Sequence, residues 1–503
     1  MNNKVSLAAR PMKRLLLIWL SLLLLCVGDG FKTRVCAQTP DPLLGTWSGS
    51  VHHGEESKLL VLHFEIHEKR KITVLFFDVP EIKFQRLGPI PVVKQGDEYK
   101  AAVFNFRLAA DQKSITGHWA FDGHNLPFEL KPGALTAIPA PPPPPTGRIA
   151  QPVWTFKTGG AIWSSPVVAE NTVYFGSNDG IIYALQAKSG KLTWQYKTGG
   201  LVVARPTLDG SSLYALSDDG NLYKLDRKSG KLAWQFDTHG GAVAREFPSS
   251  NSTTYDYLTS AATVIDGTVY IGSADKKLYA VDAQTGREKW HFETQGIIRS
   301  TPTVANGLVY IGSYDHHVYA VDAKTGAQRW KFDTLEPIVS SPLVANGTMY
   351  IGSRSSDLFA FDAATGQVKW KYFYWSSWVE SSARLRDGIL YVGSSDLQQL
   401  FAIDAATGKR VWNVNTDGSA WSTPAVTAQR VYIGVVGVHD YFIEHHGGFL
   451  AVDRATGAVV WRFPLNVIPG AVDYGVASSP AVDQGLVFFG GLDGTFYAFR
   501  TDG

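Results

Sequence analysis

Cysteine is nearly absent from this 503-residue sequence, and its two cysteines both lie within the first 37 residues. From residue 38 onward no disulfide can form, so an exported chain would hold its fold by packing and backbone hydrogen bonds. An excess of charge of one sign is also missing, since 47 basic and 45 acidic residues leave a net charge of +2. That balance lacks the basic surplus expected of a nucleic-acid-binding protein.

A long hydrophobic run is missing as well. The apolar stretch at 15–28 has only 14 residues and follows a segment with four basic residues and no acidic one. A membrane-spanning helix needs about 20 apolar residues, so we expect a secretory signal peptide at 1–37, with an uncleaved anchor as the alternative. Leu25 before Cys26 does not fit a lipoprotein signal. Without 1–37 the chain carries −3 and is predicted to be periplasmic or secreted.

The motifs of common enzyme classes are absent too. The sequence has no GxSxG elbow, no HExxH helix, no P-loop and no Rossmann glycine pattern between a strand and a helix. No segment shows a helical hydrophobic period. These absences favour an all-β protein without a recognisable catalytic motif.

Tryptophan, by contrast, recurs at intervals of 40 to 56 residues through the last two thirds of the chain. Each interval divides into four short segments that alternate apolar and polar residues, separated by glycine-containing turns such as 305–307 and 323–326. Four-stranded units of this length predict a β-propeller. The repeating tryptophans are Trp154, Trp194, Trp234, Trp290, Trp330, Trp370, Trp412 and Trp461.

The last unit is one strand short. It has strand-like segments at 478–482, 486–490 and 495–499, and the chain then stops at Gly503. Residues 152–157, before the first complete unit, supply a matching fourth strand. We therefore expect an eight-bladed propeller over 151–503 that is closed by strands from both ends.

The repeat resembles the pyrroloquinoline-quinone-type (PQQ-like) propeller repeat, with its pattern Ala-x-Asp-x-x-Thr-Gly-x-x-x-Trp. The pattern stands at 280–290, 320–330, 360–370, 402–412 and 451–461. The resemblance implies that the tryptophans dock neighbouring blades together. Propellers of this kind occur in quinoprotein dehydrogenases and in the outer-membrane-protein assembly lipoprotein.

The residues before the propeller form a separate unit. Alternating apolar runs over 38–137 predict a small antiparallel β-barrel or sandwich, which weakly resembles lipocalin-like modules. Residues 138–150 are a proline-rich linker, expected to be an extended polyproline II spacer. The histidines of the small unit are expected to be solvated and not to bind metal; they are His52, His53, His63 and His67.

Insertions should gather on one face of the ring. Loops entering the first strand of a blade share a face with loops between its second and third strands, and all long insertions fall there. They are 240–258, 435–447 and 465–477. Long loops on a rigid scaffold commonly carry function, so this insertion-rich face is the expected binding face.

Candidate ligand-binding residues come from the start of each innermost strand, where side chains should approach the axis. Aromatic rings with an arginine and carboxylates suit a planar anionic ligand, although they could equally fill the axis or contact a protein. The candidates for cofactor binding are Trp163, Arg299, Glu380, Trp421 and Asp473.

Two functions are open. The first is an exported, non-catalytic scaffold that binds a protein through the insertion-rich face and needs no cofactor or metal. The alternative is a periplasmic dehydrogenase that oxidises alcohols or sugars with pyrroloquinoline quinone and calcium. Many of the enzymes that the repeat resembles have a disulfide between two adjacent cysteines, and this sequence has no adjacent cysteines. The histidine-rich segment at 439–446 is expected to be a polar loop and not a metal site.

Overall fold

The computed structural model describes residues 41–121, 123–133, 142–243, 245, 256–439 and 443–503, so the predicted leader lies outside the described residues. The chain divides into two compact units, the second of which begins at Pro143. The described residues form strands, with short 3-10 turns at Pro80–Ile82 and Gly240–Ala242. None of their helical segments is long and apolar enough to cross a bilayer.

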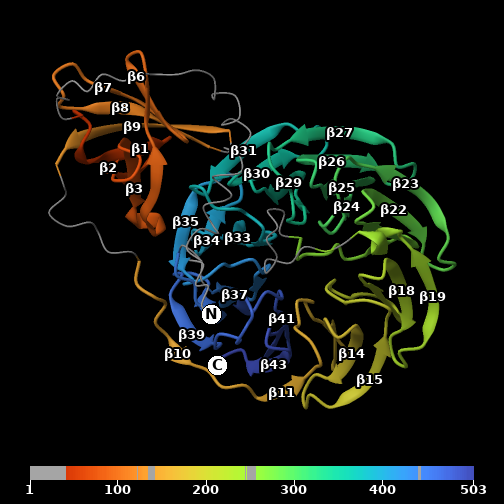
Figure 1. The fold of residues 1–503 in the computed structure, drawn as a ribbon. Helices are drawn as coiled ribbons and strands as arrows, with labels where there is room; N and C mark the ends of the chain where they lie inside the picture. Colours follow the sequence, from red (N-terminus) through yellow and green to blue (C-terminus); the bar gives the residue numbers. More distant parts are fainter. Residues whose placement is uncertain (1–40, 122, 134–141, 244, 246–255, 440–442) are drawn as a thin grey trace, which may run out of the picture. The chain divides into compact units, whose positions relative to one another are not determined.

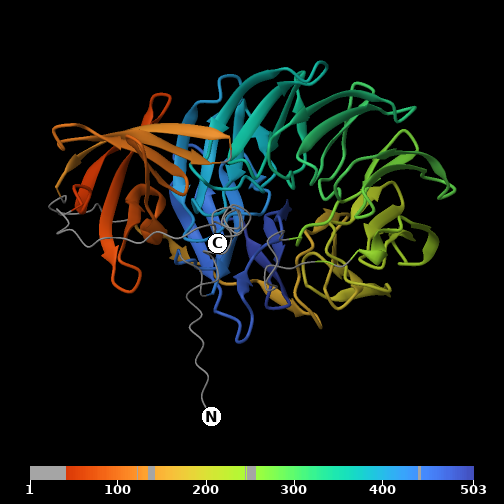
Figure 2. The same cartoon turned by 45° about the horizontal axis from the view of Figure 1, so that its top comes forward.

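The first unit is a single antiparallel sheet that curls into a nearly closed barrel, as expected from its alternating runs (red to orange in Figure 2). The strand order is β4-β3-β2-β1-β9-β8-β7-β6-β5, so the pairing of β1 with β9 joins two meanders. The strands are β1 (Gly45–His53), β2 (Glu56–His67), β3 (Ile72–Val79), β4 (Phe84–Pro91), β5 (Val93–Gln95), β6 (Glu98–Ala101), β7 (Phe104–Leu108), β8 (Ile115–Phe121) and β9 (His124–Pro132).

Aromatic side chains fill this barrel. The ring of Phe77 lies 5.1 Å from that of Phe104 and 5.8 Å from that of Trp119. Strand β9 alternates buried and exposed residues along most of its length, as a half-buried strand should. The expectation of a solvated His63 is wrong, because its Nε2 lies 2.5 Å from an oxygen of the buried Asp78.

The second unit is an eight-bladed propeller (Figure 1). Blades 1 to 3 are β12 (Val167–Ala169), β13 (Thr172–Gly176), β14 (Ile181–Gln186) and β15 (Leu192–Lys197); β16 (Thr207–Asp209), β17 (Ser212–Leu216), β18 (Asn221–Asp226) and β19 (Leu232–Asp237); β20 (Thr263–Ile265), β21 (Thr268–Gly272), β22 (Lys277–Asp282) and β23 (Glu288–Glu293). Blades 4 to 6 are β24 (Thr303–Ala305), β25 (Leu308–Gly312), β26 (His317–Asp322) and β27 (Gln328–Asp333); β28 (Leu343–Ala345), β29 (Thr348–Gly352), β30 (Asp357–Asp362) and β31 (Val368–Phe373); β32 (Arg384–Arg386), β33 (Ile389–Gly393), β34 (Gln399–Asp404) and β35 (Arg410–Asn415).

The last two blades contain strands from distant parts of the chain. Blade 7 has β36 (Ala425–Val426), β37 (Arg430–Val438), β38 (Gly448–Asp453) and β39 (Val459–Pro464), extended by β10 (Arg148–Ile149) and β40 (Asp473–Gly475). Blade 8 has β41 (Ala481–Asp483), β42 (Leu486–Gly490), β43 (Thr495–Arg500) and, as its outermost strand, β11 (Trp154–Lys157).

Each repeat tryptophan is bonded to the next blade. The Trp330 indole N–H donates to the carbonyl of Ala363 at 3.1 Å, and its ring lies on Gly366 of the same turn. A Cβ at Gly366 would stand 2.7 Å from that ring, and the glycine has φ +75°, so no other residue fits there without strain. All eight tryptophans make this bond, to Ala187, Arg227, Ala283, Ala323, Ala363, Ala405, Arg454 and Thr501 in chain order.

Closure of the ring follows the sequence prediction. Strand β11 pairs antiparallel with β43, with Trp154 opposite Ala498. A second latch was not predicted: β10, at the end of the proline-rich linker, pairs in parallel with β39, and Nη2 of Arg148 donates to the carbonyl of Gly503 at 2.8 Å. A two-residue strand after a proline run carries no sequence period by which it could be recognised.

Removal of the closing strand should open blade 8. A chain that begins at residue 158 loses β11, exposing the edge of β43 and leaving the turn that Trp154 contacts without its tryptophan. We expect its melting midpoint to fall by at least about 5 °C relative to a chain beginning at residue 151, which likewise lacks β10 but keeps β11. Differential scanning calorimetry measures both, and equal midpoints would reject closure through β11.

Candidate functional site

The axis of the propeller is lined by the first strand of each blade. First strands of neighbouring blades contact one another, for example β16 with β20 and β24 with β28. The insertions at 435–447 and 465–477 join into one structure, because β37 extends into the first of them and pairs with β40 of the second. Val436 lies opposite Gly475 in this ladder. The two insertions therefore form a single rim.

An aromatic cluster lies where the first strands begin. Trp163 and Trp421, both predicted to face the axis, are each 8% exposed. The ring of Tyr257 packs against both, at centroid distances of 5.5 Å from Trp163 and 4.6 Å from Trp421. Tyr257 comes from the end of the 240–258 insertion, so this loop reaches the rings of blades 1 and 7. Sequence reasoning missed Tyr257, since loop residues have no repeat position.

Glu380 is held by two neighbours in the same place. The hydroxyl of Tyr257 donates to its Oε2, and Nε of Arg354 donates to its Oε1 at 2.8 Å. Burial and the charge of Glu380 raise the pKa of Tyr257 well above its ordinary value, so the phenol stays protonated and donates. The Arg354 guanidinium also lies 4.4 Å from the ring of Trp378.

Arg299 is also paired within the chain. Its Nε donates to Oδ1 of Asp256 at 2.6 Å, and its Nη2 donates to the other carboxylate oxygen. Arg245, from the same insertion as Asp256, donates to Oδ2 of Asp218 at 2.6 Å and to the carbonyl of Leu258 at 2.8 Å. Guanidinium–carboxylate pairs with two hydrogen bonds are strong and directional, and these two hold residues 256–258 of the insertion in place.

We call this group of seven side chains the axial plug. It consists of Asp256 and Tyr257 from the insertion and five side chains that contact them or Glu380. Those side chains are Trp163, Arg299, Arg354, Glu380 and Trp421. In this arrangement four of the five predicted cofactor residues, all but Asp473, are engaged with other side chains of the protein. The Tyr257 ring packs on both tryptophans, and the charges of Arg299 and Glu380 are already neutralised.

Asp473, the fifth predicted residue, lies apart from these pairs. It stands in β40 opposite Val438, and its Oδ1 is buried without a hydrogen-bond partner among the described residues. Burial raises the pKa of Asp473 from 3.8 to about 7. The structure thus places a carboxyl group at the blade 7 and 8 rim that is neutral in mildly acidic solution.

The histidine-rich segment is only partly visible, since residues 440–442 lie outside the described part. Nδ1 of His446 lies 2.9 Å from Oδ2 of Asp417, and His445 is buried. Across the ranges that the structure describes, no three His, Cys, Asp or Glu side chains gather as a metal site would require.

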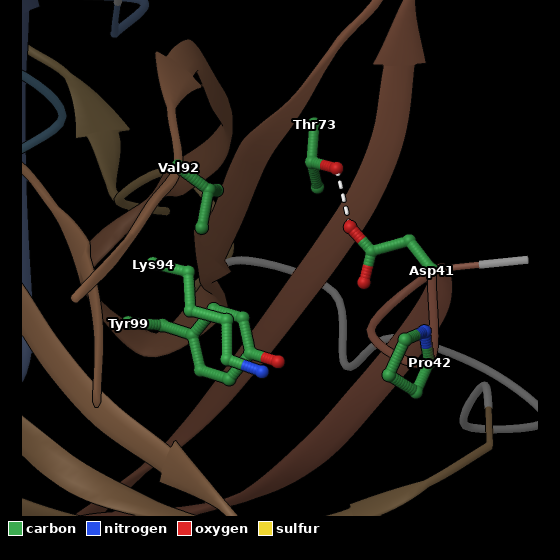
Figure 3. Close-up of a pocket in the computed structure, with 6 residues that line it drawn as sticks. All are labelled: Asp41, Pro42, Thr73, Val92, Lys94 and Tyr99. Atoms are coloured by element: carbon green, nitrogen blue, oxygen red, sulfur yellow. Dashed lines mark hydrogen bonds between the residues drawn. The ribbon is translucent and has the colours of Figure 1, made fainter. Parts of the chain in front are cut away.

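Two cavities lie away from the plug. One, of about 230 Å³, is in the barrel unit, where Oγ1 of Thr73 donates to Oδ2 of Asp41 at 2.5 Å and Lys94 lies along Tyr99 (Figure 3). The other, of about 590 Å³, lies between the turns of blades 1 and 2, beside the ion pair of Arg227 with Glu170. Neither cavity includes any of the predicted ligand residues.

The buried carboxyl of Asp473 predicts an unusual pH dependence of stability. In the unfolded chain it ionises above pH 3.8, whereas the fold keeps it protonated to about pH 7. The folded state binds the extra proton, so its stability falls as pH rises between these values. We expect Asp473→Asn to exceed the parent in unfolding free energy by about 2–4 kcal/mol at pH 8 and to match it near pH 4.

Urea unfolding at several pH values measures this difference, with the exposed Asp97 as control. Asp97→Asn should leave the difference from the parent nearly constant. An Asp473→Asn variant whose difference from the parent also stays constant with pH would contradict the assignment.

Comparison with known proteins agrees with this architecture. Similar solved structures include BamB from Moraxella catarrhalis (17% identity, 70% of this chain and 100% of that one, TM-score 0.52). They also include a quinohemoprotein alcohol dehydrogenase from Comamonas testosteroni (15%, 71% and 78%, 0.55) and the computationally designed Ika8 protein (17%, 68% and 97%, 0.54). At these identities the likeness shows the fold alone. No curated protein matches the chain.

A family model identifies the repeat more closely. The model of the outer membrane protein assembly factor BamB matches residues 144–265, 251–387 and 374–503. The matched segments together run through the whole propeller, which is more than half of the chain. The protein therefore belongs to the family of PQQ-like propellers whose model is that of the outer membrane protein assembly factor BamB.

Proposed function

We propose that this protein is an exported, non-catalytic propeller that binds a protein partner through its insertion-rich face. The observation that carries the proposal is the axial plug. The side chains best suited to hold a planar anionic cofactor contact one another and the 240–258 insertion instead. The outer surface of the insertion-rich face then remains as the place for a protein partner to bind.

Exposed apolar side chains on the same face support a protein partner. Val243, Leu335 and Val467 all lie on connections that lead from the last strand of one blade to the first strand of the next, and they are 40%, 53% and 46% exposed. Apolar side chains that stay in water on a binding face are suited to the core of a protein interface.

The family gives the proposal a setting. The description of its model names an outer membrane protein assembly factor. With the expected leader at 1–37, this chain would work in the periplasm or outside the cell, and its partner would be a protein of the same compartment. The small barrel unit is a second domain carried by this chain, for which we propose no separate role.

Quinone addition tests the dehydrogenase alternative. Purified protein is mixed with pyrroloquinoline quinone and calcium, and the absorption spectrum and dye-linked oxidation of alcohols and sugars are recorded. Because the plug engages the candidate cofactor residues on the insertion-rich side of the axis, we expect no saturable spectral change and no turnover. Saturable binding that Arg299→Ala abolishes, and that the exposed-residue control Arg500→Ala retains, would favour the dehydrogenase.

Site-specific photo-cross-linking tests the partner. A photoreactive amino acid is placed at Leu335 or Val467, and as control at Ile265, which is 37% exposed on the opposite, turn-bearing face. In cells that produce the chain we expect a discrete protein adduct from the first two positions and none from Ile265. Equal adducts from all three positions, or none from any, would contradict binding through the insertion-rich face.

A further inference from the structure

Two arginines near the axis, both exposed to solvent, differ from the buried arginines described above. Arg205 immediately precedes Pro206 at the start of the first strand of blade 2, and Arg384 begins the first strand of blade 6. Blades 2 and 6 lie four apart in a ring of eight, so the two residues approach the axis from opposite sides. Both keep accessible surface.

Neighbouring blades show what these positions normally hold. At the repeat position equivalent to Arg205, most blades have serine or threonine. The hydroxyl there accepts a hydrogen bond from a backbone N–H of the preceding blade; Ser341, for example, accepts from Thr301 at 2.9 Å. At the repeat position equivalent to Arg384, the other blades have threonine or an aliphatic residue. Thr303 is one of the threonines, and its hydroxyl donates to the carbonyl of Pro342 at 2.6 Å. Arg205 and Arg384 are the only charged residues at these two repeat positions across the eight blades.

Among the described residues, which do not include 246–255, neither arginine has an ion-pair partner. Arg299, Arg354 and Arg245 each bind a carboxylate. The described residues give neither Arg205 nor Arg384 a side-chain hydrogen bond, although the backbone of Arg384 pairs with Tyr391 in the sheet. Burial lowers the pKa of both guanidinium groups, and the positive charge of Arg384 lowers that of Arg205 further. This effect agrees with both side chains extending toward the axis.

The axial plug limits access from one side. Val203, which packs in the same buried cluster as Trp163, Tyr257 and Trp421, precedes Arg205 by two residues, with a bend at Ala204 between them. The chain therefore places Arg205 at most about 7 Å from this cluster, on the side away from the insertion-rich face. A ligand of the arginines would come from the opposite face, where the turns lie, and it would have to be small.

We propose that Arg205 and Arg384 form a binding site for a small dianionic oxyanion at the propeller axis. Two guanidinium groups flanked by neutral hydroxyl-bearing walls would bind the oxygens of such an ion through charge-assisted hydrogen bonds, and its two negative charges would cancel their repulsion. The site lies below the plug and is separate from the candidate residues for a quinone. Its ligand chemistry is that of inorganic phosphate, sulfate or a short dicarboxylate.

Titration of the full chain tests the site. Sodium sulfate, sodium phosphate and disodium succinate are each added at an ionic strength held constant with sodium chloride. Isothermal calorimetry and thermal unfolding are recorded for the parent, Arg205→Gln, Arg384→Gln and the exposed-arginine control Arg500→Gln. Phosphate binding without succinate binding identifies the phosphate–sulfate class, and the reverse identifies a dicarboxylate.

We expect one equivalent of at least one dianion to bind to the parent and to the control. Each axial variant should weaken that affinity about tenfold or more. In chloride alone, both axial variants should melt at or above the parent, since the repulsion between the arginines is gone. Arg205→Lys and Arg384→Lys keep the charge and should retain measurable binding if the glutamine variants fold poorly.

The proposal is overturned if the parent responds to all three dianions as it does to chloride. It is also overturned if folded glutamine variants bind as tightly as the parent, or if the lysine variants, used where the glutamine variants fold poorly, bind no dianion. Axial variants that melt well below the parent in chloride while binding the dianion unchanged would show a purely structural role.

Discussion

One contact holds the propeller together: the tryptophan that ends each repeat lies on the glycine of the next blade's turn and donates its indole N–H to a carbonyl there. The contact joins two blades through a close backbone approach that only glycine permits, and it occurs at all eight junctions. Because it uses the outer strands and one set of turns, the opposite ends of the blades are free to carry insertions. The binding face is a consequence of that freedom.

A ring of eight blades leaves an axis that side chains must fill or line. Toward the insertion-rich face this chain fills it with its own loop, and the buried charges there are satisfied in pairs, because leaving one unpaired would cost several kcal/mol. Further along the axis, Arg205 and Arg384 come from opposite blades and have no carboxylate partner among the described residues. The contrast between these two layers separates a structural plug from a site that still needs a ligand.

The sequence was sufficient for the fold because the information is local and repeated. The tryptophan interval, the turn glycines and the missing last strand predicted eight blades and closure through β11, while β10 is too short to leave a pattern. The site was less predictable. Repeat position indicated that Trp163 and Trp421 approach the axis, but their neighbour Tyr257 belongs to an insertion, and its bond to Glu380 spans 123 positions. Arg205 did leave a signal, since it replaces a hydroxyl that most blades share.

The central claim is that Tyr257 plugs the axis by bonding Glu380. A double-mutant cycle of Tyr257→Phe and Glu380→Gln, followed by urea unfolding at pH 7, measures that bond directly. The account predicts a coupling energy of about 1–3 kcal/mol, whereas Tyr257→Phe combined with the exposed Asp97→Asn of the barrel unit should be additive. Additivity of the first pair to within about 0.5 kcal/mol would contradict the plug.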